Sequence, residues 1–256
     1  MPSSKSLKLK ILFIENSVSH IAPGGSHKSL INLYDNLDPE IYKPYILLNE
    51  KNNTITKLLS DREVKYLNHQ TVDIRRDSKV GFYQKTENQN KNIIYKIIRS
   101  NLGIVYRIFR DIIPMTIKTI KIIKKLDVDL VHTNTRIGSN QFGILAAWIC
   151  KKKIISHERT WTEKNWFNNF IVKIPDKIIC ISKSIKQNLL SIGVRDEKCV
   201  VIFNGRVFKH ISDLVLNKYD ENNSEPFKIG LMANISEYKG HTIFVNAATR
   251  LLKRYP

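Results

Sequence analysis

Long apolar runs, cysteines and acidic side chains are all scarce in this sequence. A helix that spans a membrane needs about 20 consecutive apolar residues, and the sequence has no run of even 18. The apolar stretch 11–14 is too short to be the core of a signal peptide. We therefore expect a protein of the cytoplasm.

The scarcity of cysteine argues against a disulfide framework and against a zinc site. Cys150, Cys180 and Cys199 are far apart in the chain, and no two of them have the C-x-x-C spacing of paired zinc ligands. An odd number of cysteines in apolar surroundings is typical of buried free thiols in a reducing compartment. We expect the three thiols to be free.

Acidic residues are outnumbered by basic ones, 23 to 42, which gives a formal net charge of +19. Such an excess predicts a polyanionic partner, which is a nucleic acid, an anionic membrane or a phosphorylated substrate. A genome rich in A and T favours Lys, Ile and Asn, and this bias is an alternative source of part of the charge.

What the sequence does have is a regular alternation of apolar strand candidates and helix candidates. The first strand candidate, Leu7–Glu15, is apolar enough to be buried on both faces. Strands separated by helices predict an α/β fold with a Rossmann-like, doubly wound parallel sheet. We expect further strands at 42–48, 64–67, 129–135, 152–159, 176–182, 199–205 and 227–233.

The pattern also predicts how the chain is divided. Residues 1–207 would form an N-terminal Rossmann-like domain and 208–225 a linker. Residues 226–256 would supply the first strand and helix of an incomplete second Rossmann-like domain, which is too little to bury a core alone. Within the first domain, Ser26 is expected to cap a helix, and Pro114 is expected to break or kink the segment 91–125 into two helices.

Polar residues and glycines collect at the carboxyl ends of the predicted strands. In doubly wound sheets, ligands bind along this edge, where the strand order reverses. Ser182 and Asn204–Gly205 also have a local interpretation, as a helix cap and a tight turn. The strand ends concerned are Gly24–Gly25, His132–Asn134, His157–Arg159, Ser182 and Asn204–Gly205.

Several of these segments resemble the retaining glycosyltransferases of family 4, which have the GT-B fold. The similar segments are APGGSHKSLINLYDNL, DLVHTNT, KIISHER, DKIICISKSIKQNLLSIGV with KCVVIFNG, and KIGLMANISEYKGHTIFVNAATRLLKRYP. The resemblance implies two Rossmann-like domains that face each other across a cleft. It also implies that a nucleotide sugar is held mainly by the C-terminal domain, and that residues 1–207 are the acceptor side.

The resemblance assigns roles to individual residues. His157 would hydrogen-bond the transferred sugar, which makes it the catalytic candidate, while Gly24, Gly25, Lys239 and Gly240 would bind the donor. The local alternatives are a buried histidine satisfied by the backbone, a plain strand-to-helix turn and a solvated lysine.

Asn234 is a further donor-binding candidate, at a position where the family has an arginine. An amide supplies neither the charge nor the bidentate fork of an arginine. The resemblance implies no metal and no cofactor, because the nucleotide sugar is a substrate. The acceptor-side candidates are His27, Asn134, Arg136, Glu158 and Arg159.

By resemblance the protein is an enzyme that transfers a hexose from a nucleotide sugar to a glycan or a lipid-linked acceptor. The pathway would be the synthesis of a surface polysaccharide such as lipopolysaccharide or capsule. The family's paired-glutamate motif lies downstream of the Lys-Gly loop and is missing from this chain. The alternative is a truncated, inactive product, or a half that binds the acceptor or the membrane.

The segment 91–125 holds nine Lys or Arg residues and a single acid, Asp111. Its isoleucines recur at helical spacing, which predicts an amphipathic helix that rests on an anionic membrane surface. A sheet-covering helix with a solvated basic face is the structural alternative. Nucleic acid is the competing polyanion, although no nucleic-acid-binding signature is present. The membrane-surface candidates are Lys96, Arg99, Arg107, Arg110, Lys118 and Lys121.

Overall fold

The computed structural model describes residues 8–16, 25–48, 59, 61–67, 101–205, 228–233, 235 and 239–255. Contacts divide the chain into two compact units, Met1–Gly205 and Arg206–Pro256, and each is described by itself. The predicted site residues Gly24, Lys96, Arg99 and Asn234 lie outside the described residues. Among the residues that the structure describes, no helix is both long enough and apolar enough to span a bilayer.

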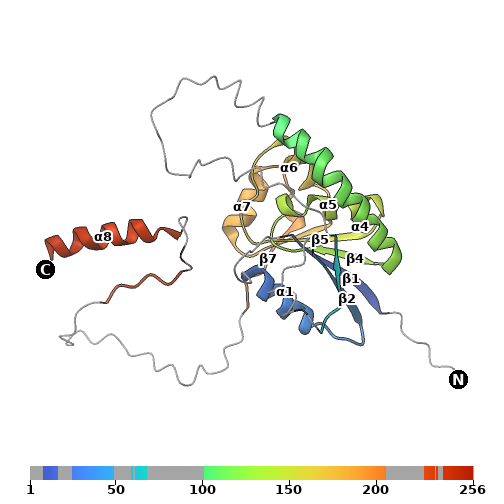
Figure 1. Cartoon of the computed structure of the whole chain (residues 1–256), viewed down its shortest axis with the longest axis horizontal. Helices are drawn as coiled ribbons and strands as arrows, with labels where there is room; N and C mark the ends of the chain where they lie inside the picture. The colour runs from blue at the N-terminus through green and yellow to red at the C-terminus, as the bar shows by residue number, and fades with distance from the viewer. Residues whose placement is uncertain are drawn as a thin grey trace. The chain divides into compact units, whose positions relative to one another are not determined.

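The first unit is built on a seven-stranded sheet in the order β3-β2-β1-β4-β5-β6-β7, with every neighbouring pair parallel (Figure 1). The doubly wound sheet predicted from the alternation is thus confirmed. The strand order reverses between β1 and β4, which defines the topological switch point. The strands are β1 (Leu9–Glu15), β2 (Tyr42–Leu48), β3 (Val64–Tyr66), β4 (Leu130–Thr133), β5 (Lys153–Glu158), β6 (Lys177–Cys180) and β7 (Cys199–Val201).

Alternate residues of β1 belong to two different apolar clusters, one on each face of the sheet. Ile11 and Phe13 pack with Leu30 of α1 (Gly25–Asp35). Leu12 and Ile14 belong to a larger cluster on the other face. The helices that contribute to this second cluster are α4 (Ile113–Leu126), α5 (Gln141–Ile149), α6 (Trp166–Ile171) and α7 (Lys183–Ser191).

Two helix predictions need correction. Pro114 was expected to break or kink the helix, but it does not break it: residues 101–126 are helical throughout, with a π-helical turn, Ile108–Ile112, directly before α4 (Figure 1). A proline lacks an N–H, and here it stands at the start of α4, directly after a stretch whose hydrogen-bond pattern is already interrupted. Ser26, expected as a helix cap, lies within α1, which begins at Gly25.

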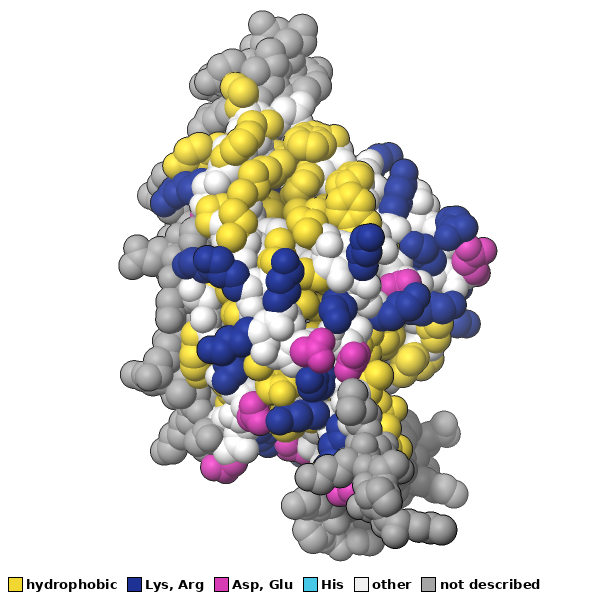
Figure 2. Space-filling view, turned by 90° about the vertical axis from the view of Figure 1, so that its right-hand side faces the viewer, with side chains coloured by type: hydrophobic (Ala, Val, Ile, Leu, Met, Phe, Trp, Pro, Cys, Tyr) yellow, Lys and Arg dark blue, Asp and Glu magenta, His cyan; other side chains and the backbone are white. Residues whose placement is uncertain are grey.

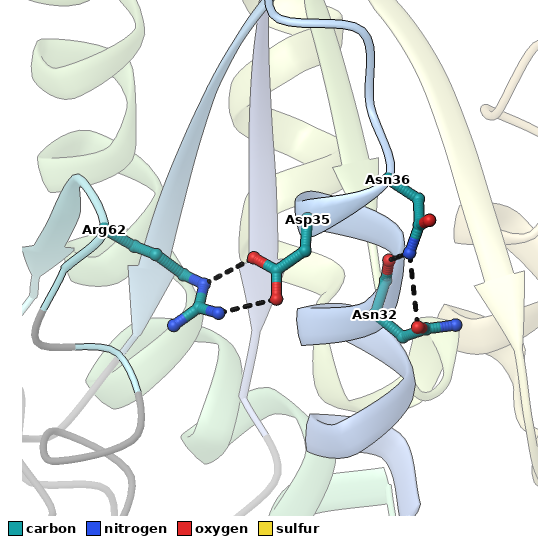
Figure 3. A network of polar contacts seen from close by, with 4 residues as sticks. All are labelled: Asn32, Asp35, Asn36 and Arg62. Carbon is teal, nitrogen blue, oxygen red and sulfur yellow. Dashed lines mark hydrogen bonds and ion pairs between the residues drawn. The ribbon is translucent and has the colours of Figure 1, made fainter. Parts of the chain in front are cut away.

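A bidentate ion pair ties α1 to the turn before β3. The Arg62 guanidinium donates from Nε to Asp35 Oδ1 at 2.9 Å and from Nη2 to Asp35 Oδ2 at 2.6 Å (Figure 3). Asn36, directly after α1, donates from Nδ2 to the Asn32 carbonyl oxygen at 2.8 Å. The ion pair joins the end of α1 to the edge of the sheet that β3 forms.

The three cysteines of the first unit are free thiols. Cys180 and Cys199 are buried, and Cys150 is half-buried.

In the second unit, residues 228–233 form no strand, contrary to the prediction, because a strand needs a neighbouring strand to hydrogen-bond its backbone groups. The helix α8 (His241–Arg254) follows Gly240, and none of its residues is buried.

Candidate active site

The candidate site lies at the carboxyl edge of the sheet, where the ends of β1, β4 and β5 are neighbours. The pairing of Ile14 with Thr133 places Glu15, the last residue of β1, beside Asn134. Both side chains are buried, with exposed fractions of 2% and 1%. A charged carboxylate at that depth needs hydrogen-bond donors, and β4 supplies them.

The Glu15 carboxylate is held by two consecutive residues that follow β4. Asn134 Nδ2 donates a short hydrogen bond to Glu15 Oε2, and it also donates to the Ser26 carbonyl oxygen at 3.2 Å. The Thr135 hydroxyl donates to the two oxygens of Glu15, at 2.6 and 2.8 Å. Thr135 adopts a φ of 85°, which is rare for a β-branched residue. Such strain costs about 1–3 kcal/mol and clusters at functional sites.

Arg159 connects three strand ends through its guanidinium. Nε donates to Asn134 Oδ1 at 3.0 Å, and Nη1 donates to Asn204 Oδ1, beyond β7, at 2.6 Å. Nη2 lies 3.2 Å from Nδ1 of His157, on β5. Burial lowers the pKa of Arg159 and the Glu15 carboxylate opposes that change, so the guanidinium remains charged.

Two histidines also lie near this edge of the sheet, one on β4 and one on β5. His132 lies between Phe13 and His157, with ring centroids 5.0 and 5.8 Å away. Burial, with a smaller contribution from the positive charge of Arg159, lowers the pKa of His132 to about 4 and that of His157 to about 3. Both rings are therefore neutral near pH 7. Among the described residues, the buried Nε2 atom of each ring has no hydrogen-bond partner.

Glu158 lies on the opposite face of the sheet from His157 and Arg159, because successive side chains of a strand alternate. It is fully buried, and it accepts from Ile137 N at 3.1 Å, Ser156 Oγ at 2.8 Å and Thr162 Oγ1 at 3.0 Å. Burial raises the pKa of this carboxyl to about 7, against the lowering effect of its donors. The side chain joins β5 to the loops on either side of it.

The structure brings some of the predicted site residues together and leaves others apart. His157, Asn134 and Arg159 form one cluster, while Arg136 donates from Nε to Ser139 Oγ at 2.9 Å. His27 is buried within α1, and Gly25 is its exposed first residue. Lys239, which is exposed, and Gly240, with a φ of 76°, belong to the second unit.

Sequence reasoning missed Glu15 and Thr135 and treated Asn204 as structural. A carboxylate directly after a buried apolar strand was the available signal for Glu15. Nothing in the sequence pointed to the positive φ of Thr135. Asn204 was expected at the carboxyl edge of the sheet but was interpreted as part of an Asn-Gly turn, because its contact with Arg159 joins residues 45 positions apart.

The sequence also contains a D-x-D spacing, Asp127-Val128-Asp129, whose two carboxylates are the type of ligand that divalent cations prefer. Here it lies before β4, at the amino edge of the sheet and away from the candidate site. Asp129 Oδ2 accepts from the Lys10 backbone N–H at 2.8 Å, and Asp127 pairs with the Lys10 ammonium at 3.2 Å. Within the described residues, no group of three or more acidic, histidine or cysteine side chains gathers to hold a metal.

The predicted membrane-surface residues that the structure describes lie on or beside a partly apolar surface. In the helix 101–126, Arg107 Nη2 donates to Gln141 Oε1 at 2.9 Å and Lys118 Nζ donates to the Leu67 carbonyl oxygen at 3.2 Å. Arg110 and Lys121 are exposed. Figure 2 shows hydrophobic side chains gathered in one patch on this side of the molecule, with Lys and Arg side chains bordering it.

The comparisons with known proteins concern the family and the fold of the chain. The model of Glycosyltransferase Family 4 matches residues 72–206, just over half of the chain. No curated protein matches the chain in sequence. Among solved structures, the Anabaena protein HepE in complex with UDP-glucose is 17% identical, with a TM-score of 0.52 over 77% of this chain and 44% of HepE.

The lipopolysaccharide outer core galactosyltransferase WaaB is similar as well, at 17% identity and a TM-score of 0.51 over 79% of this chain and 47% of WaaB. The chain therefore spans less than half the length of either protein. At these identities the likeness shows the fold, which is the Rossmann-like fold of GT-B enzymes. With the family match over residues 72–206, it follows that the chain belongs to Glycosyltransferase Family 4.

Proposed function

We propose that the protein takes part in glycosyl transfer from a nucleotide sugar to a glycan or a lipid-linked acceptor in surface polysaccharide synthesis. The main support is the connected network Glu15–Asn134–Arg159–His157 at the switch point of a family 4 sheet. Every member is fixed by at least one neighbour, so the edge is preorganised before any ligand binds. We place this reaction in the cytoplasm, at the inner face of the membrane.

The chemistry needs no redox step and no covalent protein intermediate. The bond between the anomeric carbon and the nucleoside diphosphate breaks, an acceptor hydroxyl oxygen bonds to that carbon, and the hydroxyl proton passes to the leaving diphosphate. His157 would donate a hydrogen bond to a hydroxyl of the transferred sugar, and Asn134 and Arg159 would hold the acceptor side of the site. Gly25 would bind the donor. For the second unit, taken by itself, we propose Lys239 as a donor-binding residue, because a lysine stabilises the charge that develops on a leaving diphosphate.

Donor binding and turnover by the 256-residue chain test this proposal. UDP-glucose is the first donor to try, because HepE was crystallised with it, followed by UDP-galactose and GDP-mannose. We expect calorimetric binding of one donor and release of its nucleotide. We also expect turnover to fall about tenfold or more in His157→Ala, which loses one hydrogen bond of about 1.4 kcal/mol or more. A chain that binds no donor would instead support the alternative of an acceptor- or membrane-binding half.

A second proposal concerns the helix 101–126, which we infer rests on an anionic bilayer. An exposed apolar stripe runs along it at helical spacing and is flanked by Arg110, Lys118 and Lys121. Apolar insertion combined with basic side chains is the pattern of a helix that lies in the membrane interface. Each basic side chain near such a surface contributes about 1 kcal/mol. The stripe comprises Leu102, Val105, Tyr106, Phe109, Ile113 and Ile117.

Vesicle sedimentation distinguishes insertion of the apolar stripe into the bilayer from binding by charge attraction alone. We expect binding to phosphatidylcholine vesicles only when phosphatidylglycerol is included. Phe109 is 69% exposed, so Phe109→Ser should weaken this binding about tenfold, because burying a Phe side chain is worth about 1.5–3 kcal/mol. The control Ile41→Ser removes an exposed apolar side chain beside β2 and should have no effect. Equal binding by both variants, or tighter binding to duplex DNA, would refute the membrane surface.

A further inference from the structure

The contact between Arg159 and His157 constrains where the imidazole proton is. A guanidinium has only donors, so a ring nitrogen that lies 3.2 Å from Arg159 Nη2 has to be the acceptor. That nitrogen is Nδ1, which leaves the single proton of a neutral ring on Nε2. A second proton on Nδ1 would point at the guanidinium and place two like charges in contact.

Arg159 is itself held so that it cannot turn away from the histidine. Its Nε and Nη1 donate to the amide oxygens of Asn134 and Asn204, at 3.0 and 2.6 Å. The Asn134 amide is in turn oriented by Glu15, because its Nδ2 donates to that carboxylate. A chain of hydrogen bonds therefore runs from Glu15 at the end of β1, through the residue after β4, to Arg159 and His157 at the end of β5, and it fixes the orientation of these side chains.

His157 Nε2, which carries the ring's single proton, is buried and has no hydrogen-bond partner among the described residues. An enclosed N–H without an acceptor costs about 1–3 kcal/mol, so such groups call for a functional explanation. The charged and titratable groups that act on His157 are Arg159 and His132, and both lower its pKa. A neutral N–H suits an uncharged oxygen acceptor, such as a hydroxyl of a sugar.

We propose that Arg159 is a positioning residue that fixes His157 as a neutral imidazole with its proton on Nε2. His157 thus offers the site a hydrogen-bond donor, and it does not serve as a general base near neutral pH. The use of that donor on a sugar hydroxyl rests on the proposed glycosyl transfer. The position of the proton is a property of the free protein, so it can be tested without any substrate.

Long-range ¹H–¹⁵N spectra of the histidine-labelled protein report the proton position directly, and His157→Gln assigns the signal. We expect a protonated Nε2 and an unprotonated Nδ1 at pH 7, and no imidazolium signal down to the lowest pH at which the protein stays folded. Arg159→Met should introduce the Nδ1–H tautomer and shift the His157 titration to higher pH. The control Arg195→Met removes an equal charge from an exposed ion pair with Glu197 and should change neither.

A protonated Nδ1 in the wild-type protein, or an unchanged tautomer in folded Arg159→Met, would overturn the proposal. If Arg159→Met does not fold, Arg159→Gln removes the charge and supplies an amide oxygen that can accept from an Nδ1–H, so a mixture of tautomers and a titration at higher pH are expected. A wild-type-like tautomer in that variant would also contradict the proposal. Failure of donor binding would leave these spectra unaffected, so the two proposals are tested separately.

Discussion

The buried carboxyl of Glu158 makes the stability of the protein depend on pH in a direction that can be worked out. Its pKa is about 7 in the folded protein, compared with an ordinary value of 4.5 that we take for the unfolded chain. The folded state therefore binds the proton more tightly than the unfolded state does. The resulting contribution to stability is fully present below pH 4.5 and is lost as the pH rises through 7.

The difference between the two pKa values corresponds to about 3 kcal/mol, since each pH unit is worth about 1.4 kcal/mol. Glu158→Gln should remove this dependence. Its amide oxygen can accept from Ile137 N and Thr162 Oγ1, as Glu158 Oε2 does, while its NH₂ takes the place of the oxygen that accepts from Ser156 Oγ, so that the Ser156 hydroxyl has to turn from donor to acceptor. At pH 5 the variant and the wild type should be about equally stable, whereas at pH 8 the variant should be the more stable one.

Urea unfolding followed by tryptophan fluorescence from pH 5 to 8 measures both proteins, and the difference between them cancels all other titrating groups. The exposed control Glu40→Gln should give a curve parallel to that of the wild type. The reasoning fails if the curves of wild type and Glu158→Gln are parallel. It also fails if the variant is the less stable protein at pH 8, because the hydrogen bonds from the three donors would then stabilise the carboxylate by more than burial destabilises it.

Two predictions concern packing and backbone conformation. Gly143→Ala would place a Cβ 2.5 Å from the Cδ1 atom of the buried Ile14, so a loss of about 1–2 kcal/mol is expected from overpacking. Adding Ile14→Val removes that Cδ1 and should recover part of the loss, whereas strictly additive effects in urea unfolding would contradict the clash. Lys151 follows α5 with a φ of 55°, so Lys151→Gly should raise the stability by about 1 kcal/mol, since a left-handed residue other than Gly costs that much or more. Lys151→Ala keeps the strain and should show no such gain in thermal unfolding.

The sequence was sufficient for the sheet but not for every helix. Apolar runs such as the one ending at Glu15 are strong signals, because a parallel strand is buried on both faces and its neighbours impose few other requirements. The continuity of the helix through Pro114 depends on a π-helical turn, which no local pattern reveals. The strand expected at 227–233 is the opposite case. Its described residues, 228–233, form no strand, because pairing with a neighbour decides whether an apolar segment becomes a strand.

The location of the candidate site could be predicted, and the roles within it only partly. The rule that ligands bind at the carboxyl ends of strands drew attention to His157, Glu158 and Arg159 together. Strand alternation alone separates Glu158 from the other two, since it points to the opposite face. The link from Glu15 to Thr135 spans 120 residues, and only the tertiary structure brings them together.

The central place of β1 has a consequence for how the chain is assembled during synthesis. β1 is made before the other strands of this sheet, and one of its edges pairs with β2 soon afterwards. Its other edge pairs with β4, so it stays open until residues near 130 have left the ribosome. An unpaired apolar edge is a template for wrong pairing with another chain. Nascent chains that stall between β2 and β4 should therefore be the species that most need a chaperone.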